Sequence, residues 1–165
     1  MVIAGISYTW ILVKCLNKLD METLEFKIRI KATPEKIWSV LWEDETYKKW
    51  TSAFCEGSYA VSNWNEGDKI HFMSPNGEGM NSIIEKKIPN EYMAFKHIGE
   101  IKDFKELPID DETKKWTGAM ETYRLSPDDE FVDLIAQVDV VEKYIDYFKE
   151  AFPKGLETVK ELSEK

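Results

Sequence analysis

The last segment of the chain, residues 141–165, has the clearest pattern of apolar and polar positions. Its apolar residues recur at steps of three and four, which is the spacing of one face of an α-helix. Charged residues fill most of the other positions, so the opposite face is expected to meet water. The pattern predicts one long amphipathic C-terminal helix. Its apolar stripe consists of Val141, Tyr144, Ile145, Phe148, Phe152, Leu156, Val159 and Leu162.

The beginning of the periodic region, from residue 21, has a different pattern. Apolar residues from Leu24 to Ile30 alternate with charged ones, which predicts a half-buried first strand. Thr33 followed by Pro34 provides an N-cap and a first-turn proline for a short helix. Asp44 is expected to cap a second short helix.

The middle of the chain is divided by turn residues such as Asn65-Glu66-Gly67 and Pro75-Asn76-Gly77. A charged segment, 100–115, contains a proline and is expected to form a surface loop. Strands are predicted at 58–61, 69–73, 79–88, 92–99, 116–125 and 131–140.

These elements together predict an α+β fold of the helix-grip type. Consecutive strands with short turns form an antiparallel meander, and pairing the first strand beside the last gives a sheet of about seven strands. An amphipathic helix cannot bury its apolar stripe alone. The sheet is therefore expected to curve around the C-terminal helix, with two short helices after the first strand and any remaining space as a pocket.

Residues 1–20 do not share this periodicity. Their apolar run is too short to span a bilayer, and Lys14 interrupts it. The features of a secretory signal are missing or weak. We interpret residues 1–20 as an N-terminal extension outside the fold, with a membrane anchor as the less favoured alternative, and residues 21–165 as a single domain.

Composition excludes several classes of partner. The formal net charge of the 165 residues is −9 and no basic block occurs, so nucleic acid and anionic membranes are not expected partners. Cys15 and Cys55 show no C-x-x-C spacing. Two unrelated thiols fit a reducing compartment, which predicts a cytoplasmic location.

Three short motifs carry a resemblance to a known family. They are Ala-Thr-Pro-x-x-Ile-Trp at 32–38, Trp-Asn-Glu-Gly-Asp at 64–68 and Phe-Pro-Lys-Gly-Leu at 152–156. With the sequence around them, the chain resembles the SRPBCC superfamily over residues 21–162. Within it, the chain is similar to the activators of the heat-shock-protein-90 ATPase. The resemblance implies a START-like helix-grip fold and an apolar small molecule held between sheet and helix, but no shared catalytic motif.

Few residues are candidates for catalysis or metal binding. Ile70 and Phe72 are expected to face inward, which turns His71 outward, whereas Lys96 marks the outer face of its strand and turns His97 inward. A lone inward histidine is more often a hydrogen-bonded wall residue than a base, and no spacing indicates a metal site. We therefore predict no catalytic residue, no metal and no cofactor.

Glu121 allows two interpretations, because both faces of its predicted strand are mixed. If it faces inward, it is a buried carboxylate and a candidate general base. The favoured interpretation is a solvated surface acid.

Aromatic residues are a stronger signal than the titratable groups. They make up 13% of the chain, more than a small core needs, so some are expected to line a pocket and others to fill the core. The predicted cavity-lining residues are Trp50, Phe54, Phe72, Met80, Ile84, Met93, Phe95, His97, Trp116, Tyr123, Tyr144, Phe148 and Phe152.

Two functions of different classes follow. The first is a carrier or sensor module that binds a lipid or another small apolar molecule in this cavity. The second is a protein-interaction module, similar to the activators of the heat-shock ATPase. It would use the outer face of the sheet or the charged loop predicted at 100–115. An enzyme acting on an apolar substrate ranks below both. An open apolar cavity would favour binding, and a filled core with an exposed apolar patch would favour interaction.

Overall fold

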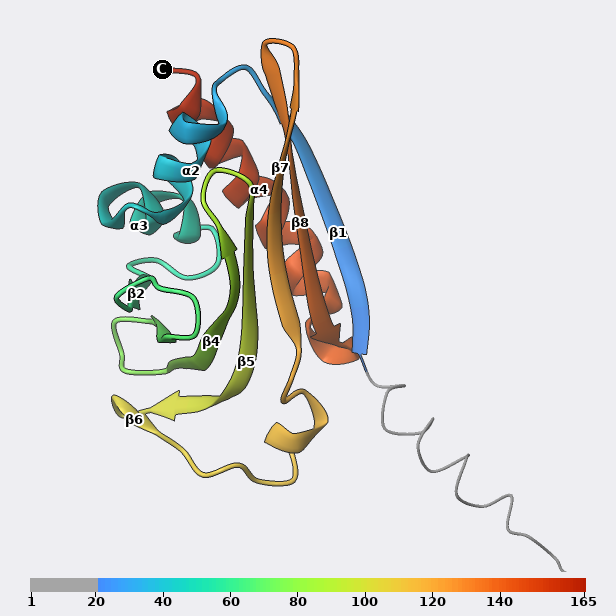
Figure 1. Ribbon diagram of the computed structural model, residues 1–165. Helices are drawn as coiled ribbons and strands as arrows, with labels where there is room; N and C mark the ends of the chain where they lie inside the picture. Colours follow the sequence, from blue (N-terminus) through green and yellow to red (C-terminus); the bar gives the residue numbers. More distant parts are fainter. Residues whose placement is uncertain (1–20) are drawn as a thin grey trace, which may run out of the picture.

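The computed structural model describes residues 21–165, which form a curved antiparallel sheet with helices on its concave side (Figure 1). The interpretation of residues 1–20 as an extension lies outside the described residues. The strands follow the order β1-β8-β7-β5-β4-β3-β2, and the short β6 pairs with β5. This arrangement is the predicted α+β helix-grip fold.

The bounds of the elements follow the chain. The strands are β1 (Met21–Ile30), β2 (Tyr59–Val61), β3 (Lys69–Met73), β4 (Gly79–Ile88), β5 (Tyr92–Lys102), β6 (Lys105–Glu106), β7 (Met120–Asp128) and β8 (Phe131–Val141). The α-helices are α2 (Pro34–Trp42), α3 (Asp44–Thr51) and α4 (Ile145–Ser163), and the 3-10 turns are η1 (Thr113–Lys115) and η2 (Glu142–Tyr144).

The first and last strands of the chain pair along their whole length, from Met21 opposite Val141 to Ile30 opposite Val132. The inward side chains of β1 therefore meet those of β8, and Leu24, Ile30 and Leu134 are almost fully buried. A strand formed at the start of the domain thus closes against one formed near its end. The predicted pairing of first and last strands is confirmed.

The sheet is irregular between β4 and β5. Its register shifts once between Asn81 and Ser82 and again between Ile84 and Lys86. Bulges of this kind add local twist and bend the strand that carries them. They lie in the part of the sheet that curves away from β1 and β8.

Helix α2 begins as the sequence predicts. The Thr33 hydroxyl accepts a hydrogen bond from the Lys36 amide at 3.3 Å, and Pro34 occupies the first turn. The prediction for Asp44 is wrong: Asp44 is the first residue of α3, and Glu43 holds the N-cap position without a side-chain hydrogen bond.

Three predicted boundaries differ from the structure. The C-terminal helix begins at Ile145, because β8 continues to Val141 and η2 makes the corner. The strand predicted at 116–125 begins at Met120 and ends at Asp128, so Trp116 belongs to the preceding turn. The loop predicted at 100–115 contains the end of β5, all of β6 and η1.

Helix α4 packs against β1 at one edge of the sheet and against α3. Phe152, 1% exposed, stacks on Phe26 of β1 with ring centroids 4.7 Å apart and meets Phe54 edge to face at 4.9 Å. A methyl group added at Gly155 would lie 3.3 Å from the carbonyl oxygen of Trp50. The glycine therefore lets α4 approach the end of α3 closely.

These contacts predict unequal costs for truncation along α4. Phe152→Ala should lower the free energy of unfolding by about 3–5 kcal/mol, because the lost side chain is enclosed on several sides. Phe148 lies one turn earlier and is only half-buried, so Phe148→Ala should lower the free energy of unfolding by clearly less. Urea unfolding of both variants measures the difference, and equal costs would contradict the packing described.

Candidate functional site

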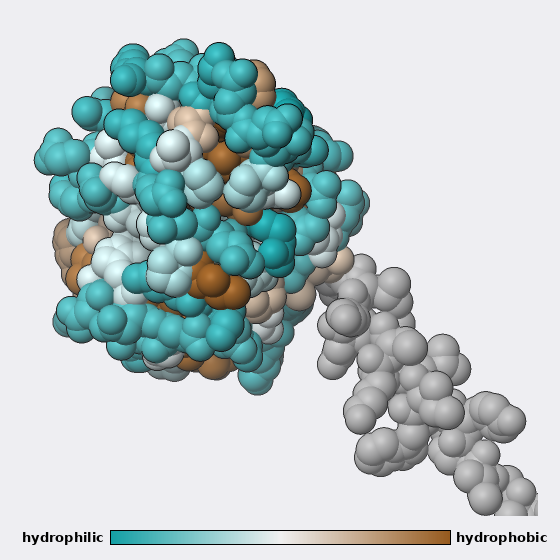
Figure 2. Space-filling view, turned by 45° about the horizontal axis from the view of Figure 1, so that its top comes forward, coloured by the Kyte–Doolittle hydropathy of each residue, from teal (hydrophilic) through white to brown (hydrophobic). Residues whose placement is uncertain are grey.

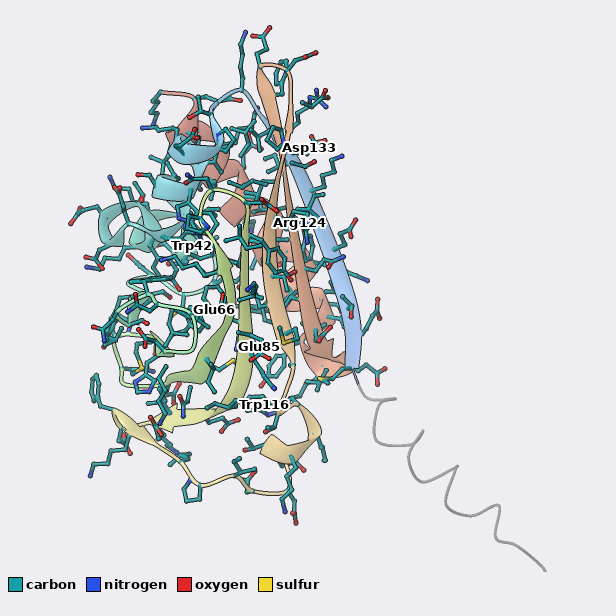
Figure 3. The ribbon with its side chains drawn as sticks, in the orientation of Figure 1. Trp42, Glu66, Glu85, Trp116, Arg124 and Asp133 are labelled. Carbon is teal, nitrogen blue, oxygen red and sulfur yellow. The ribbon has the colours of Figure 1, made fainter. Side chains whose placement is uncertain are left out.

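An open pocket of about 1210 Å³ lies between the concave face of the sheet and α4. One of its ends is closed by α3 and the aromatic side chains beneath it. The other is bordered by the start of β1, the end of β8, η1 and η2, where the pocket opens. Trp42 and Trp116 both line it and lie toward these opposite ends of the sheet (Figure 3).

The closed end is built from interlocking aromatic rings. Trp42 of α2 contacts Tyr123 edge to face at 5.1 Å and Phe95 at 5.4 Å. Trp50 of α3 lies 6.0 Å from the Tyr123 ring and donates its indole N–H to the Leu41 carbonyl at 3.0 Å. Edge-to-face pairs of this kind fix ring orientations. The end wall is closely packed and almost wholly apolar.

One polar cluster interrupts this apolar wall, and it consists of Ser82, His97, Glu121 and Tyr123. Ser82 Oγ lies 2.8 Å from His97 Nδ1, and His97 Nε2 lies 3.3 Å from one carboxylate oxygen of Glu121. The Tyr123 hydroxyl donates to the other carboxylate oxygen. Three adjacent strands, β4, β5 and β7, supply these four side chains.

The cluster has a buried end and an open end. Ser82 is fully buried and His97 is 5% exposed, whereas the side chain of Glu121 is 22% exposed and lines the pocket. A serine nucleophile would need access to its substrate, so Ser82 acts as an orienting partner of the imidazole and not as a nucleophile. The chemically accessible group of the cluster is the Glu121 carboxylate.

Burial sets the protonation of the two neighbouring phenols. Burial, with a smaller contribution from the Glu121 charge, holds the pKa of Tyr47 far above its usual value. The pKa of Tyr123 is also well above its usual range, first because of burial and then because of Glu121. Both phenols therefore stay protonated, and Tyr123 remains a hydrogen-bond donor to the carboxylate.

Most of the predicted lining residues surround this pocket. Ile84 and Met93 do not: Ile84 is fully buried in the core, and Met93 borders a smaller hollow of about 260 Å³ beside Trp38 and Trp64. The residues that do line it are Trp50, Phe54, Phe72, Met80, Phe95, His97, Trp116, Tyr123, Tyr144, Phe148 and Phe152.

The two histidines point as expected. His97 faces the concave side, and His71 is half-exposed and lies 2.9 Å from the carboxylate of Glu106 on β6.

The favoured interpretation of Glu121 as a surface acid is wrong. Glu121 shares the inward face with Tyr123 and Leu125, because residues two apart on an uninterrupted strand lie on the same side of the sheet.

Sequence reasoning missed Ser82 and Tyr47 as parts of the site. Alternation along β4 carried a signal for Ser82, because it lies between Met80 and Ile84 on the same strand face; its pairing opposite His97 follows a register shift that skips Ile98 of β5. Tyr47 carried a weak signal, because it precedes Trp50 by three residues and so shares its helix face.

Known proteins match this chain by their structure. No protein-family model matches the chain, and no curated protein matches it in sequence. Among solved structures, the Aha1 dimer from Colwellia psychrerythraea superposes with a TM-score of 0.67 at 20% identity, over 87% of this chain and 96% of that one. The chain has the fold of the Aha1-like, START-related proteins. The similarity that the sequence motifs indicated is thereby confirmed at the level of the fold.

Two further solved structures share this fold. Protein MLL2253 from Mesorhizobium loti has a TM-score of 0.66 at 15% identity, over 86% of this chain and 96% of that one. DynU16, a protein of the dynemicin biosynthetic locus, has a TM-score of 0.59 at 8% identity, over 84% of this chain and 46% of that one. The described residues contain no helix long and apolar enough to cross a membrane.

The raised pKa values predict the behaviour of the protein in alkali. Ionised tyrosine absorbs in the near ultraviolet, and Tyr123 should not ionise while the protein is folded. Titration curves of the wild type and Tyr123→Phe should therefore coincide up to the pH of unfolding. If the folded variant showed one ionising tyrosine fewer than the wild type below the pH of unfolding, this expectation would be contradicted.

The same shifts fix the sign of the pH dependence of stability. Above about pH 10 the unfolded chain releases these phenolic protons and the folded chain keeps them. Their contribution to stability is complete below that pH and is lost as pH rises further. The urea midpoint should therefore fall above about pH 10, less steeply in Tyr123→Phe than in the wild type.

Proposed function

We propose that the chain binds one small, mostly apolar molecule in the pocket between the sheet and α4, as a carrier or sensor module. The observation that carries the proposal is the form of the pocket. Aromatic and apolar side chains surround one compact polar cluster, and charged side chains complete the lining. Small-molecule sites combine these features, because apolar walls supply affinity and a few fixed polar groups supply orientation.

The size of the pocket agrees with this use. At about 1210 Å³ it slightly exceeds the range of roughly 300–1,000 Å³ typical of small-molecule sites. An open mouth accounts for part of the excess. DynU16, which shares the fold, is a protein of the dynemicin biosynthetic locus.

The outer surface supplies less support for the alternative, a protein-interaction module. Figure 2 shows one face of the molecule as mostly hydrophilic, with apolar residues in small separate areas. One observation favours interaction: Phe104, Leu107 and Ile109, close together in the segment after β5, are 64%, 40% and 50% exposed. The similarity to an Aha1 dimer is compatible with this second candidate.

A neutral fluorescent probe, N-phenyl-1-naphthylamine, tests the proposal. It should bind the folded protein with one-to-one stoichiometry and brighten on transfer to apolar surroundings. Trp116→Ala and Phe148→Ala should each weaken binding by roughly fivefold or more, because each removes a half-buried wall contact worth about 1 kcal/mol or more. These residues suit the test because they are not in the enclosed core.

The matched control is Tyr92→Ala. Tyr92 lies on the convex side of β5 under the Arg124 guanidinium, outside the pocket lining. This variant should bind the probe like the wild type. No probe binding to the folded, ligand-free protein would reject the carrier function, and loss of binding in the Tyr92 variant alone would move the site to the convex face.

A further inference from the structure

The charge inside the pocket narrows the class of ligand. Glu121 presents a carboxylate whose two oxygens are held by His97 and Tyr123. A carboxylate offers about four acceptor positions, so these two partners orient it and leave positions for a ligand. A ligand group that completes this shell has to be a hydrogen-bond donor.

The partners of Glu121 satisfy its oxygens without requiring a fixed positive charge. Tyr123 stays neutral because burial raises the pKa of its hydroxyl. His97 Nε2 faces the second carboxylate oxygen at 3.3 Å, and Ser82 Oγ lies 2.8 Å from His97 Nδ1. Each of the four side chains has a polar neighbour within the cluster, and no lysine or arginine belongs to it.

The charged residues in the rest of the pocket lining are also mostly acidic. No arginine lines the described pocket, so a carboxylate or phosphate ligand would find no bidentate partner there. Clefts lined by one sign of charge concentrate ligands of the opposite sign. Besides Glu121, the acidic lining residues are Glu22, Glu78, Glu100, Glu112, Asp139 and Glu142, against Lys102, Lys115 and Lys143.

The aromatic wall accepts a cation as well. Trp42, Tyr47, Trp50 and Phe95 line the pocket together with Glu121. Aromatic rings attract ammonium groups through their quadrupole, most strongly in desolvated sites. A positively charged head group beside Glu121 would thus meet a carboxylate and aromatic surface, while an anionic group at the same place would be repelled by the carboxylate.

We propose that the ligand is an apolar molecule bearing a basic amine, whose ammonium group binds Glu121 while its apolar body lies against Phe72 and Phe148. This inference rests on the proposed binding function and specifies its ligand class. Glu121 is the specificity-determining residue, and Ser82 and His97 position it.

Three probes of equal carbon skeleton test the inference: 4-phenylbutylamine, 4-phenylbutanol and 4-phenylbutyrate. Each competes with N-phenyl-1-naphthylamine for the pocket, and the concentration for half displacement is measured. The amine should displace the dye at a concentration at least roughly tenfold below that of the acid, as a charge-assisted hydrogen bond provides. The alcohol, a neutral donor, should lie between them.

Glu121→Gln should abolish this order by bringing the amine to the level of the alcohol, with each competition referred to the dye affinity measured for that variant. A cooperative urea transition like that of the wild type shows that the variant is folded. Glu157→Gln is the matched control: it removes the same charge from the exposed face of α4, outside the pocket lining, and should preserve the order.

Two outcomes separate this inference from the function on which it rests. Failure of the dye itself to bind would reject the pocket as a ligand site. Normal dye binding would instead leave the pocket in place and overturn only the ligand class in three cases: the acid competes as well as the amine, none of the three probes competes, or the preference for the amine survives in Glu121→Gln.

Discussion

The pocket follows from a mismatch between the width of the sheet and the width of the helix that covers it. Six spacings between seven strands amount to about 29 Å, whereas a helix with its side chains is about 10–12 Å across. Helix α4 packs on β1 at one edge of the sheet and against α3, and so leaves part of the concave face of the central strands uncovered. Residual space between sheet and helix is therefore a consequence of the architecture.

Aromatic packing keeps that space from collapsing. Phe152 anchors α4 on Phe26 and Phe54, while Trp42 and Trp50 support Phe95 and Tyr123 at the closed end. These rings are held by several neighbours and cannot move inward without losing contacts. Glu121 adds a second reason, because a carboxylate on the inner wall is more stable beside solvent or a polar ligand group than in a sealed core.

The sequence was sufficient for the architecture because strand alternation and the helical stripe are local patterns. The pairing of β1 with β8 also followed, since it completes a sheet that the terminal helix can cover. His97 was placed correctly because Lys96 marks the outer face of β5. In each case a neighbouring residue of opposite character fixed the direction of the side chain.

The polar cluster could not be derived in the same way. Trp116 and Ala119 were read as strand residues, which made both faces of β7 look mixed and hid the inward direction of Glu121. Residues 122–125 alternate clearly, but Met120 and Glu121 oppose that pattern, with the apolar residue outward and the carboxylate inward. The pairing of Ser82 with His97 depends on a register shift at Ile98 of β5, and such a shift is set by the pairing of the two strands and not by the residues around Ser82.

The central claim is that the space between the sheet and α4 holds an apolar molecule. A crystal structure of the protein with N-phenyl-1-naphthylamine tests it most directly. The account predicts that the aromatic rings of the probe lie inside the pocket, against Phe72 and Phe148 and within reach of the Glu121 carboxylate. A probe found on the convex face, with the pocket filled by the protein's own side chains, would contradict it.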